Sequence, residues 1–130
     1  MTIFSKIIQG EIPAYKIAEN DLFFAILDIF PLQKGHVLVV PKIEVDKVFE
    51  LPDNYLAEML VFAKPIAKAI EASFPCNRIS MVTVGLEVPH AHLHLIPING
   101  ADDINFANDK LRLSKEELLA VQEAIVSKLA

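Results

Sequence analysis

Three of the chain's four histidines, His90, His92 and His94, lie close together and alternate with apolar residues. Successive side chains of an extended strand point to opposite faces, so residues two positions apart share a face. Pro89 and Pro97 flank the segment, and prolines are tolerated at the ends of strands. The spacing therefore predicts a strand that presents three imidazoles on one face and places the apolar residues between them in a core.

Three kinds of chemistry fit such a row of imidazoles. Neutral imidazole is a common zinc ligand, and His36 or Glu87 would complete a metal site. Alternatively, the histidines only face solvent. In the third interpretation His92 attacks phosphorus while its neighbours fix its tautomer and protonate the leaving group. The residues leave these three interpretations open. The sequence has no Gly-rich phosphate loop and no Gly-x-Ser-x-Gly motif, which argues against a P-loop enzyme and against a hydrolase with a serine nucleophile in that motif.

The elements that must position the histidines are read from periodicity. Apolar residues at three- and four-residue steps predict helices over residues 3–9, 53–73 and 114–128. Strands are predicted over residues 15–18, 22–30, 36–40, 78–84 and the histidine segment. Short turns join the second strand to the third, and a tight link at Gly85 joins the fourth to the histidine strand. The fold class is therefore α+β, with helices packed on an antiparallel sheet.

Two further polar residues stand beside the apolar strands. Asp28 interrupts the dense apolar run over residues 22–30, and carboxylates are rarely buried without partners. Taken alone, Asp28 is better explained as a solvent-facing residue at a strand end than as an acceptor for a ligand's hydroxyl groups. His36 opens the following strand, where a single histidine is usually a surface residue.

Composition limits the classes of protein to consider. The chain has 130 residues, 53% of them apolar and 22% charged, which suggests one globular domain over residues 1–130. The net charge of −5 argues against binding to nucleic acid. Cys76 is the single cysteine, so no intrachain disulfide forms, as is usual in a reducing compartment. With no signal peptide and no membrane-spanning segment recognised, the expected location is the cytoplasm.

The histidine segment resembles the signature of the histidine-triad (HIT) family, in which three histidines alternate with apolar residues and two more apolar residues follow. Residues 3–13 resemble the family's opening segment, and residues 27–31 and 35–42 resemble its central hairpin. Residues 85–89 are similar to the lead-in to the triad. These blocks cover nearly the whole chain in the family's order. The resemblance to the compact, Hint-like branch implies an antiparallel sheet of about five strands with helices packed on it.

The resemblance also implies roles for the four histidines. His92 would attack the α-phosphate as the nucleophile. His94 would contact the phosphate and assist the leaving group. His90 would orient His92, partly through its main-chain carbonyl, and His36 would join the cluster from the neighbouring hairpin.

A nucleotide-binding site is implied in the same way. Asp28 would accept the ribose hydroxyls, which reverses the preference stated above. The base pocket would be lined by Phe4, Ile7 and Ile29. Gly85 and Glu87, in the lead-in to the triad, complete the predicted nucleotide-binding residues.

The implied function is hydrolysis at the α-phosphate of a purine nucleotide, through a nucleotidyl-histidine intermediate. The substrate would be a nucleoside phosphoramidate or a dinucleoside polyphosphate, and the protein would be a homodimer without a cofactor. The alternative is a nucleotide-binding or regulatory protein with little catalytic activity. That alternative rests on Leu86, which replaces the family's usual glutamine, and on a shortened link before Gly85.

The family often carries a structural zinc site that this sequence alters. Its Cys-x-x-Cys pair would stand at Thr2 and Ser5, and a further histidine would stand at Glu44. All three positions are occupied by other residue types here. The sequence therefore predicts no metal.

Overall fold

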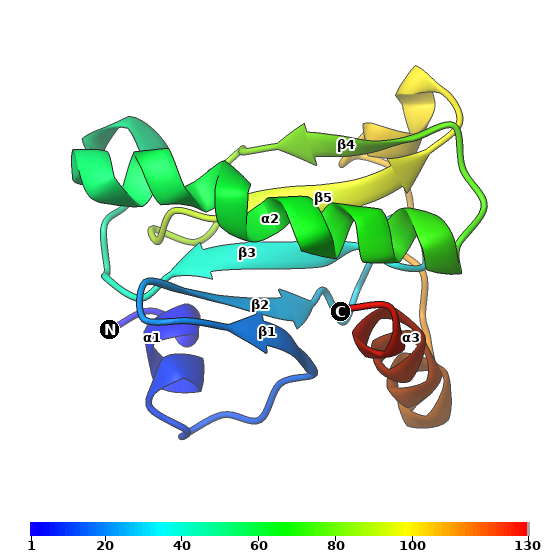
Figure 1. Cartoon of the computed structure of the whole chain (residues 1–130), viewed down its shortest axis with the longest axis horizontal. Coiled ribbons are helices and arrows are strands. Elements are labelled where there is room, and N and C mark those ends of the chain that lie inside the picture. The colour runs from blue at the N-terminus through cyan, green and yellow to red at the C-terminus, as the bar shows by residue number, and fades with distance from the viewer. Residues whose placement is uncertain (130) are drawn as a thin grey trace.

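The computed structural model describes residues 1–129, and its centre is one antiparallel sheet with the strand order β1-β2-β3-β5-β4 (Figure 1). The strands are β1 Lys16–Glu19, β2 Phe23–Leu27, β3 Val37–Pro41, β4 Arg78–Val82 and β5 Leu93–Ile98. The helices are α1 Ile3–Ile8, α2 Asp53–Ser73 and α3 Lys115–Ser127, with short 3-10 turns η1 Val48–Glu50 and η2 Ala101–Ile104. The predicted α+β class with about five antiparallel strands is confirmed.

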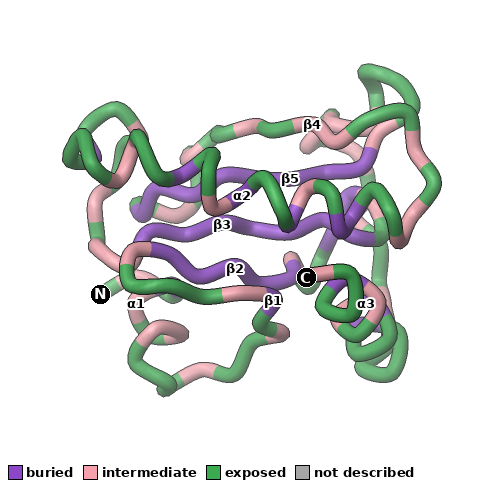
Figure 2. The backbone as a smooth tube through the Cα atoms, in the orientation of Figure 1, coloured by how far each residue is buried: buried purple, intermediate pink, exposed green. Residues whose placement is uncertain are grey.

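Each face of the sheet is covered by different helices. On one face, Val37 and Val39 of β3 and Leu93 and Leu95 of β5 join the main core beneath α2 and α3, and α2 lies across the front of the sheet in Figure 1. On the opposite face, Leu38 and its neighbours pack against α1 in a smaller cluster. The central strands are buried throughout (Figure 2). The alternation of side chains therefore sends the histidine of β5, His94, to the face that α1 covers.

The helices begin and end close to the residues predicted from periodicity. Helix α2 spans the predicted residues and continues through Pro65. Thr2 caps α1 by accepting the Ser5 N–H at 3.1 Å. Ser114 and Glu117 form the capping box that opens α3. No helix within residues 1–129 is long and apolar enough to cross a membrane.

The histidine strand differs from the prediction. Strand β5 begins at Leu93, so His94 is inside the strand while His90 and His92 precede it. The His90 N–H bonds to the Val88 carbonyl at 2.8 Å, and the Ala91 N–H bonds to the Val45 carbonyl at 2.7 Å. The segment before Leu93 is held by these main-chain bonds and not by pairing with β4, whose ladder with β5 ends at Val82 and His94. The predicted tight link was therefore wrong: β4 ends at Val82, and residues 83–92 form the connection.

Asp28 and His36, the other two polar residues noted in the sequence, lie at the ends of neighbouring strands. Asp28 directly follows β2, and His36 directly precedes β3. The Asp28 N–H donates to the His36 carbonyl at 3.1 Å, which extends the β2–β3 pairing beyond the strands. Leu38 of β3 lies opposite His94 of β5 in the sheet. These pairings bring His36, Asp28 and His94 to neighbouring positions although they are distant in the sequence.

Candidate active site

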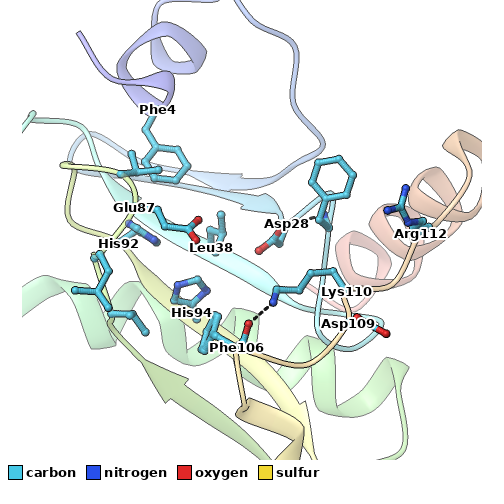
Figure 3. Close-up of a pocket in the computed structure, with 15 residues that line it drawn as sticks. Phe4, Asp28, Leu38, Glu87, His92, His94, Phe106, Asp109, Lys110 and Arg112 are labelled. Carbon is cyan, nitrogen blue, oxygen red and sulfur yellow. Dashed lines mark hydrogen bonds between the residues drawn. The ribbon is translucent and has the colours of Figure 1, made fainter.

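The α1 face of the sheet carries an open cavity of about 1100 Å³ (Figure 3). Its walls come from α1, the end of β2, strands β3 and β5, the connection before β5 and the segment after η2. Its lining residues are Phe4, Asp28, Phe30, Leu38, Val84, Gly85, Leu86, Glu87, Val88, His92, His94, Phe106, Asp109, Lys110 and Arg112.

The His92 ring is held by a main-chain carbonyl. Its Nδ1 lies 2.7 Å from the His90 carbonyl oxygen. A carbonyl only accepts, so Nδ1 carries the proton and, in the neutral ring, Nε2 carries the lone pair. The Phe4 ring packs against His92 at 5.0 Å between centroids, and the His94 ring lies at 4.9 Å. The structure thus fixes the orientation of a buried imidazole in the cavity wall, with Nε2 as the nitrogen that is not bonded to the main chain.

A second chain of hydrogen bonds fixes the tautomers of His36 and His94. The Leu32 N–H donates to Nδ1 of His36 at 3.1 Å, so Nε2 of His36 carries that ring's proton. This Nε2 lies 2.9 Å from Nδ1 of His94 and donates to it. In neutral His94 the remaining proton is then on Nε2. His94 therefore offers an N–H donor beside the His92 ring.

Burial keeps both of these rings neutral. It lowers the pKa of His36 to about 3, with the neighbouring His94 adding to the effect. Burial also lowers the pKa of His94 to about 4, again helped by a neighbouring imidazole, that of His92. A desolvated imidazole with no carboxylate in hydrogen-bond contact loses its charged form. Both rings are neutral near pH 7, as the hydrogen-bond chain requires.

His90 lies behind the cavity rather than in its lining. Its ring is fully buried, and its Nε2 lies 2.9 Å from the Pro41 carbonyl oxygen. Its Nδ1 lies 2.7 Å from Oγ1 of Thr2. Burial lowers the pKa of His90. The ring is hydrogen-bonded at both nitrogens, and its carbonyl is the group that bonds to the His92 ring.

Asp28 presents a partly exposed carboxylate to the cavity. Its Oδ1 accepts the Phe30 N–H at 3.0 Å, and its Oδ2 lies 3.7 Å from Nε2 of His36. Burial raises the pKa of Asp28, while the Phe30 hydrogen bond opposes that rise. The second carboxylate oxygen has no hydrogen bond within residues 1–129 and can accept one from a ligand.

The structure brings most of the predicted site residues together. Six of them line the cavity: Phe4, Asp28, Gly85, Glu87, His92 and His94. His36 and His90 stand behind the lining and hold it through hydrogen bonds. Ile7 lines a separate cavity of about 290 Å³. Ile29 lines neither cavity, and 47% of its surface is exposed.

Sequence reasoning missed the segment after η2, to which it assigned no functional residue. Lys110 donates to the carbonyls of Phe106 and Asn108, and the Phe106 ring packs against His94 at 4.8 Å. Figure 3 shows Lys110 on the Asp28 side of the cavity. Arg112 adds a second cation to the lining. The one available signal was Phe106, a single aromatic residue within a polar segment.

Two groups of side chains contain residue types or positions that could suggest a metal site. Ligand atoms of Asp28, His36 and His94 lie within 4.8 Å of one another. The Leu32 N–H, however, places a proton on Nε2 of His36, the nitrogen that would have to bind the ion. Around His90, the positions expected for zinc thiolates carry the hydroxyls of Thr2 and Ser5. Hydroxyls are poor zinc ligands, so this set does not fit a structural zinc.

The fold and the cavity define an α+β protein that presents neutral, oriented imidazoles on one face of an antiparallel sheet. The HIT domain model matches residues 9–100, and the chain belongs to the HIT family. It is 39% identical to the adenosine 5′-monophosphoramidase hnt1 of Schizosaccharomyces pombe, over 98% of this chain and 97% of that protein. It is 37% identical to the adenosine 5′-monophosphoramidase HNT1 of Saccharomyces cerevisiae, over 93% of this chain and 82% of that protein.

Solved structures agree with this membership. A Hit-like protein involved in cell-cycle regulation from Bartonella henselae superposes with a TM-score of 0.85 at 28% identity, over 98% of this chain and 96% of that chain. A HIT-family protein from Bacillus subtilis superposes with a TM-score of 0.73 at 33% identity, over 99% of this chain and 97% of that chain.

Proposed function

We propose that the chain is a nucleotidyl hydrolase that cleaves a purine nucleoside phosphoramidate at the α-phosphate. The observation that carries the proposal is the pairing of two nitrogens in the cavity. His92 offers a lone pair at Nε2, and His94 offers an N–H at Nε2, each fixed by its own hydrogen-bond chain. The adenosine 5′-monophosphoramidases among the relatives support the choice of substrate class.

The proposed reaction has two steps. Nε2 of His92 forms a bond to phosphorus as the bond from phosphorus to the leaving amine breaks. The amine departs with the bonding electron pair and takes up a proton from solvent, while the N–H of His94 stabilises the developing charge. Water then attacks phosphorus, which releases His92 and a nucleoside monophosphate. A dinucleoside polyphosphate would react in the same way, with a nucleotide as the leaving group.

The rest of the cavity supports the binding of a nucleotide. The unpaired oxygen of Asp28 suits the ribose hydroxyls, and Phe4 offers an apolar surface to the base. Gly85 and Glu87 lie in the connection before β5 and face the proposed phosphate position. Lys110 and Arg112 contribute positive charge that would attract an anionic ligand.

The test is turnover of adenosine 5′-monophosphoramidate by a His92→Asn variant. We expect turnover to be abolished while adenosine monophosphate still binds, because the amide retains the polar character of the ring position but cannot form the intermediate. Cys76→Ser, far from the cavity, is the control and should match the unsubstituted protein. Wild-type turnover by His92→Asn would show that His92 is not the nucleophile.

A second candidate function is nucleotide binding with little catalysis. Leu86 is 88% exposed at the cavity mouth, so an apolar side chain stands where the family usually offers a polar one. Calorimetry with adenosine monophosphate beside the turnover assay separates the two functions. Tight binding without turnover of phosphoramidates or dinucleoside polyphosphates would favour this candidate.

We also propose that the protein forms a homodimer, and a cytoplasmic location remains our expectation. Strand β4 ends the sheet and carries Met81, which is 60% exposed. Leu60 and Val61 of α2 are also exposed. An apolar edge strand that is not covered pairs readily with a second copy. Analytical ultracentrifugation should give the mass of a dimer, and Met81→Glu should give a monomer.

A further inference from the structure

The start of α1 is joined to His90 by side chains that come from three parts of the chain. Oγ1 of Thr2 lies 2.7 Å from Nδ1 of His90. Oε1 of Glu44 accepts both the Thr2 N–H and the Ser5 O–H, each at 2.7 Å. We name Thr2, Ser5, Glu44 and His90 the polar clamp. It connects a helix cap, the loop after β3 and the segment before β5.

The protons of the clamp can each be assigned. The Pro41 carbonyl only accepts, so Nε2 of His90 carries the ring proton and Nδ1 is an acceptor. The Thr2 hydroxyl must therefore donate to Nδ1. The same hydroxyl oxygen accepts the Ser5 N–H. Thr2 thus does two things at once: it caps α1, and it donates to Nδ1 of His90, whose tautomer the Pro41 carbonyl sets.

This arrangement extends to the catalytic ring. The carbonyl of His90 is the group that holds Nδ1 of His92 at 2.7 Å. Helix α1 also carries Phe4, whose ring lies 5.6 Å from the His90 ring and 5.0 Å from the His92 ring. A shift of His90 would therefore change both the orientation of the His92 ring and the position of the Phe4 ring against which it packs.

We propose that Thr2, supported by Ser5 and Glu44, is a positioning residue that orients His92 by holding His90. The proposal rests on the proposed role of His92 as nucleophile. The clamp joins these elements by hydrogen bonds. Its hydroxyl groups stand at positions where a zinc site would need better ligands. Its effect is on the chemical step, because none of Thr2, Ser5 and Glu44 lines the cavity.

Three substitutions at Thr2 separate its two hydrogen bonds. Thr2→Ser retains the cap and the O–H donor. Thr2→Asp retains an oxygen that caps α1 but, when ionised, has no O–H to give to His90. Thr2→Ala loses both. Because a second carboxylate would repel Glu44, the double variant Thr2→Asp/Glu44→Gln removes that repulsion.

The measurements are kcat and KM with adenosine 5′-monophosphoramidate, and ¹⁵N resonances of the histidine rings in the ligand-free protein. Thr2→Ser should keep kcat close to the unsubstituted value. Thr2→Ala, Thr2→Asp and the double variant should lose about tenfold in kcat with a smaller change in KM, as for other groups that orient a functional imidazole. In Thr2→Ala, Nδ1 of His90 loses its hydrogen-bond donor, so its resonance should move toward that of a free, unprotonated nitrogen. In Thr2→Asp and the double variant the carboxylate is an acceptor, so the Nδ1 resonance should move toward that of a protonated nitrogen.

The outcomes distinguish this proposal from the proposed function. If Thr2→Asp and the double variant keep both kcat and the ring resonances, Thr2 only caps the helix and the proposal is wrong. If the unsubstituted protein shows no turnover, the proposed function fails, and the ring resonances still decide whether Thr2 donates to Nδ1 of His90. Unchanged resonances in all variants would overturn the clamp's role.

Discussion

Nε2 of His36 lies 2.9 Å from Nδ1 of His94, and the Leu32 N–H on the far side of His36 gives this contact its direction. His36 is therefore the residue that makes His94 an N–H donor toward the cavity. It acts from behind the lining, since the ring is only 1% exposed.

Replacing His36 should affect both stability and catalysis. His36→Phe retains an aromatic ring but leaves the Leu32 N–H and Nδ1 of His94 without a partner. We expect the free energy of unfolding to fall by about 1–3 kcal/mol, the cost of unsatisfied buried polar groups. We also expect kcat to fall, since the tautomer of His94 is no longer fixed. Urea denaturation and turnover measure the two effects. A variant as stable as the unsubstituted protein would contradict the assigned hydrogen bonds.

The lowered pKa values of His36 and His94 predict a loss of stability in mild acid. Between the unfolded value of about 6.5 and the folded values of about 3 and about 4, the unfolded chain binds more protons. Stability therefore rises with pH across this window and is complete above about pH 6.5. The raised pKa of Asp28 acts in the opposite direction near its own titration.

Urea midpoints measured between pH 7.5 and pH 4.5 test this dependence. Each ring should cost roughly 1.4 kcal/mol of stability for every pH unit below its unfolded pKa, down to its folded pKa. The total loss over this pH range should therefore amount to a few kcal/mol. His94→Asn, which removes one of the two titrating rings, should reduce the slope. A flat profile in the unsubstituted protein would contradict the buried, neutral state of these rings.

Asp28→Asn tests the assignment of the carboxylate to the ribose. A carboxylate accepts a hydroxyl hydrogen bond more strongly than an amide does, so KM for a ribonucleotide should rise by about tenfold. A 2′-deoxyribonucleotide substrate should lose less. Asp109→Asn, which changes another carboxylate in the cavity lining, is the matched control and should raise KM less. Equal effects of both substitutions would indicate a general change of charge instead.

Gly35 is predicted to be essential for the position of His36. Its φ of +95° is unfavourable for other residues, and a Cβ there would lie 2.8 Å from Cδ2 of Phe74. Gly10 has a φ of +80°, and a Cβ added to it would meet no atom within 4 Å. Gly10→Ala therefore measures backbone strain alone, about 1 kcal/mol. Gly35→Ala should cost about 1–3 kcal/mol more because of the overpacking, as thermal or urea denaturation would show. Equal losses would refute the steric argument.

The sequence alone indicated most of the helices and strands and which side chains are candidates for the chemistry. Periodicity located α2 and the strands because burial on one face repeats along the chain. The alternation of His90, His92 and His94 identified the candidate site, whose cavity His92 and His94 line. The resemblance to the family gave Asp28 and His36 a place in the site before any geometry was known.

The tertiary structure decided how these groups are held. Whether His90 and His92 lie in the strand depends on bonds from Val45 and Val88 that no side-chain pattern encodes, because every main-chain N–H and C=O is chemically alike. The same reason hides the role of the Leu32 N–H and the Pro41 carbonyl in fixing the tautomers. Lys110 lines the cavity because its segment is held there by contacts with distant residues: the Leu111 N–H bonds to the Pro31 carbonyl, and the Phe106 ring packs against His94. Side-chain types determined what chemistry is available, and hydrogen bonds formed only in the folded chain decided which nitrogen of each ring carries a proton.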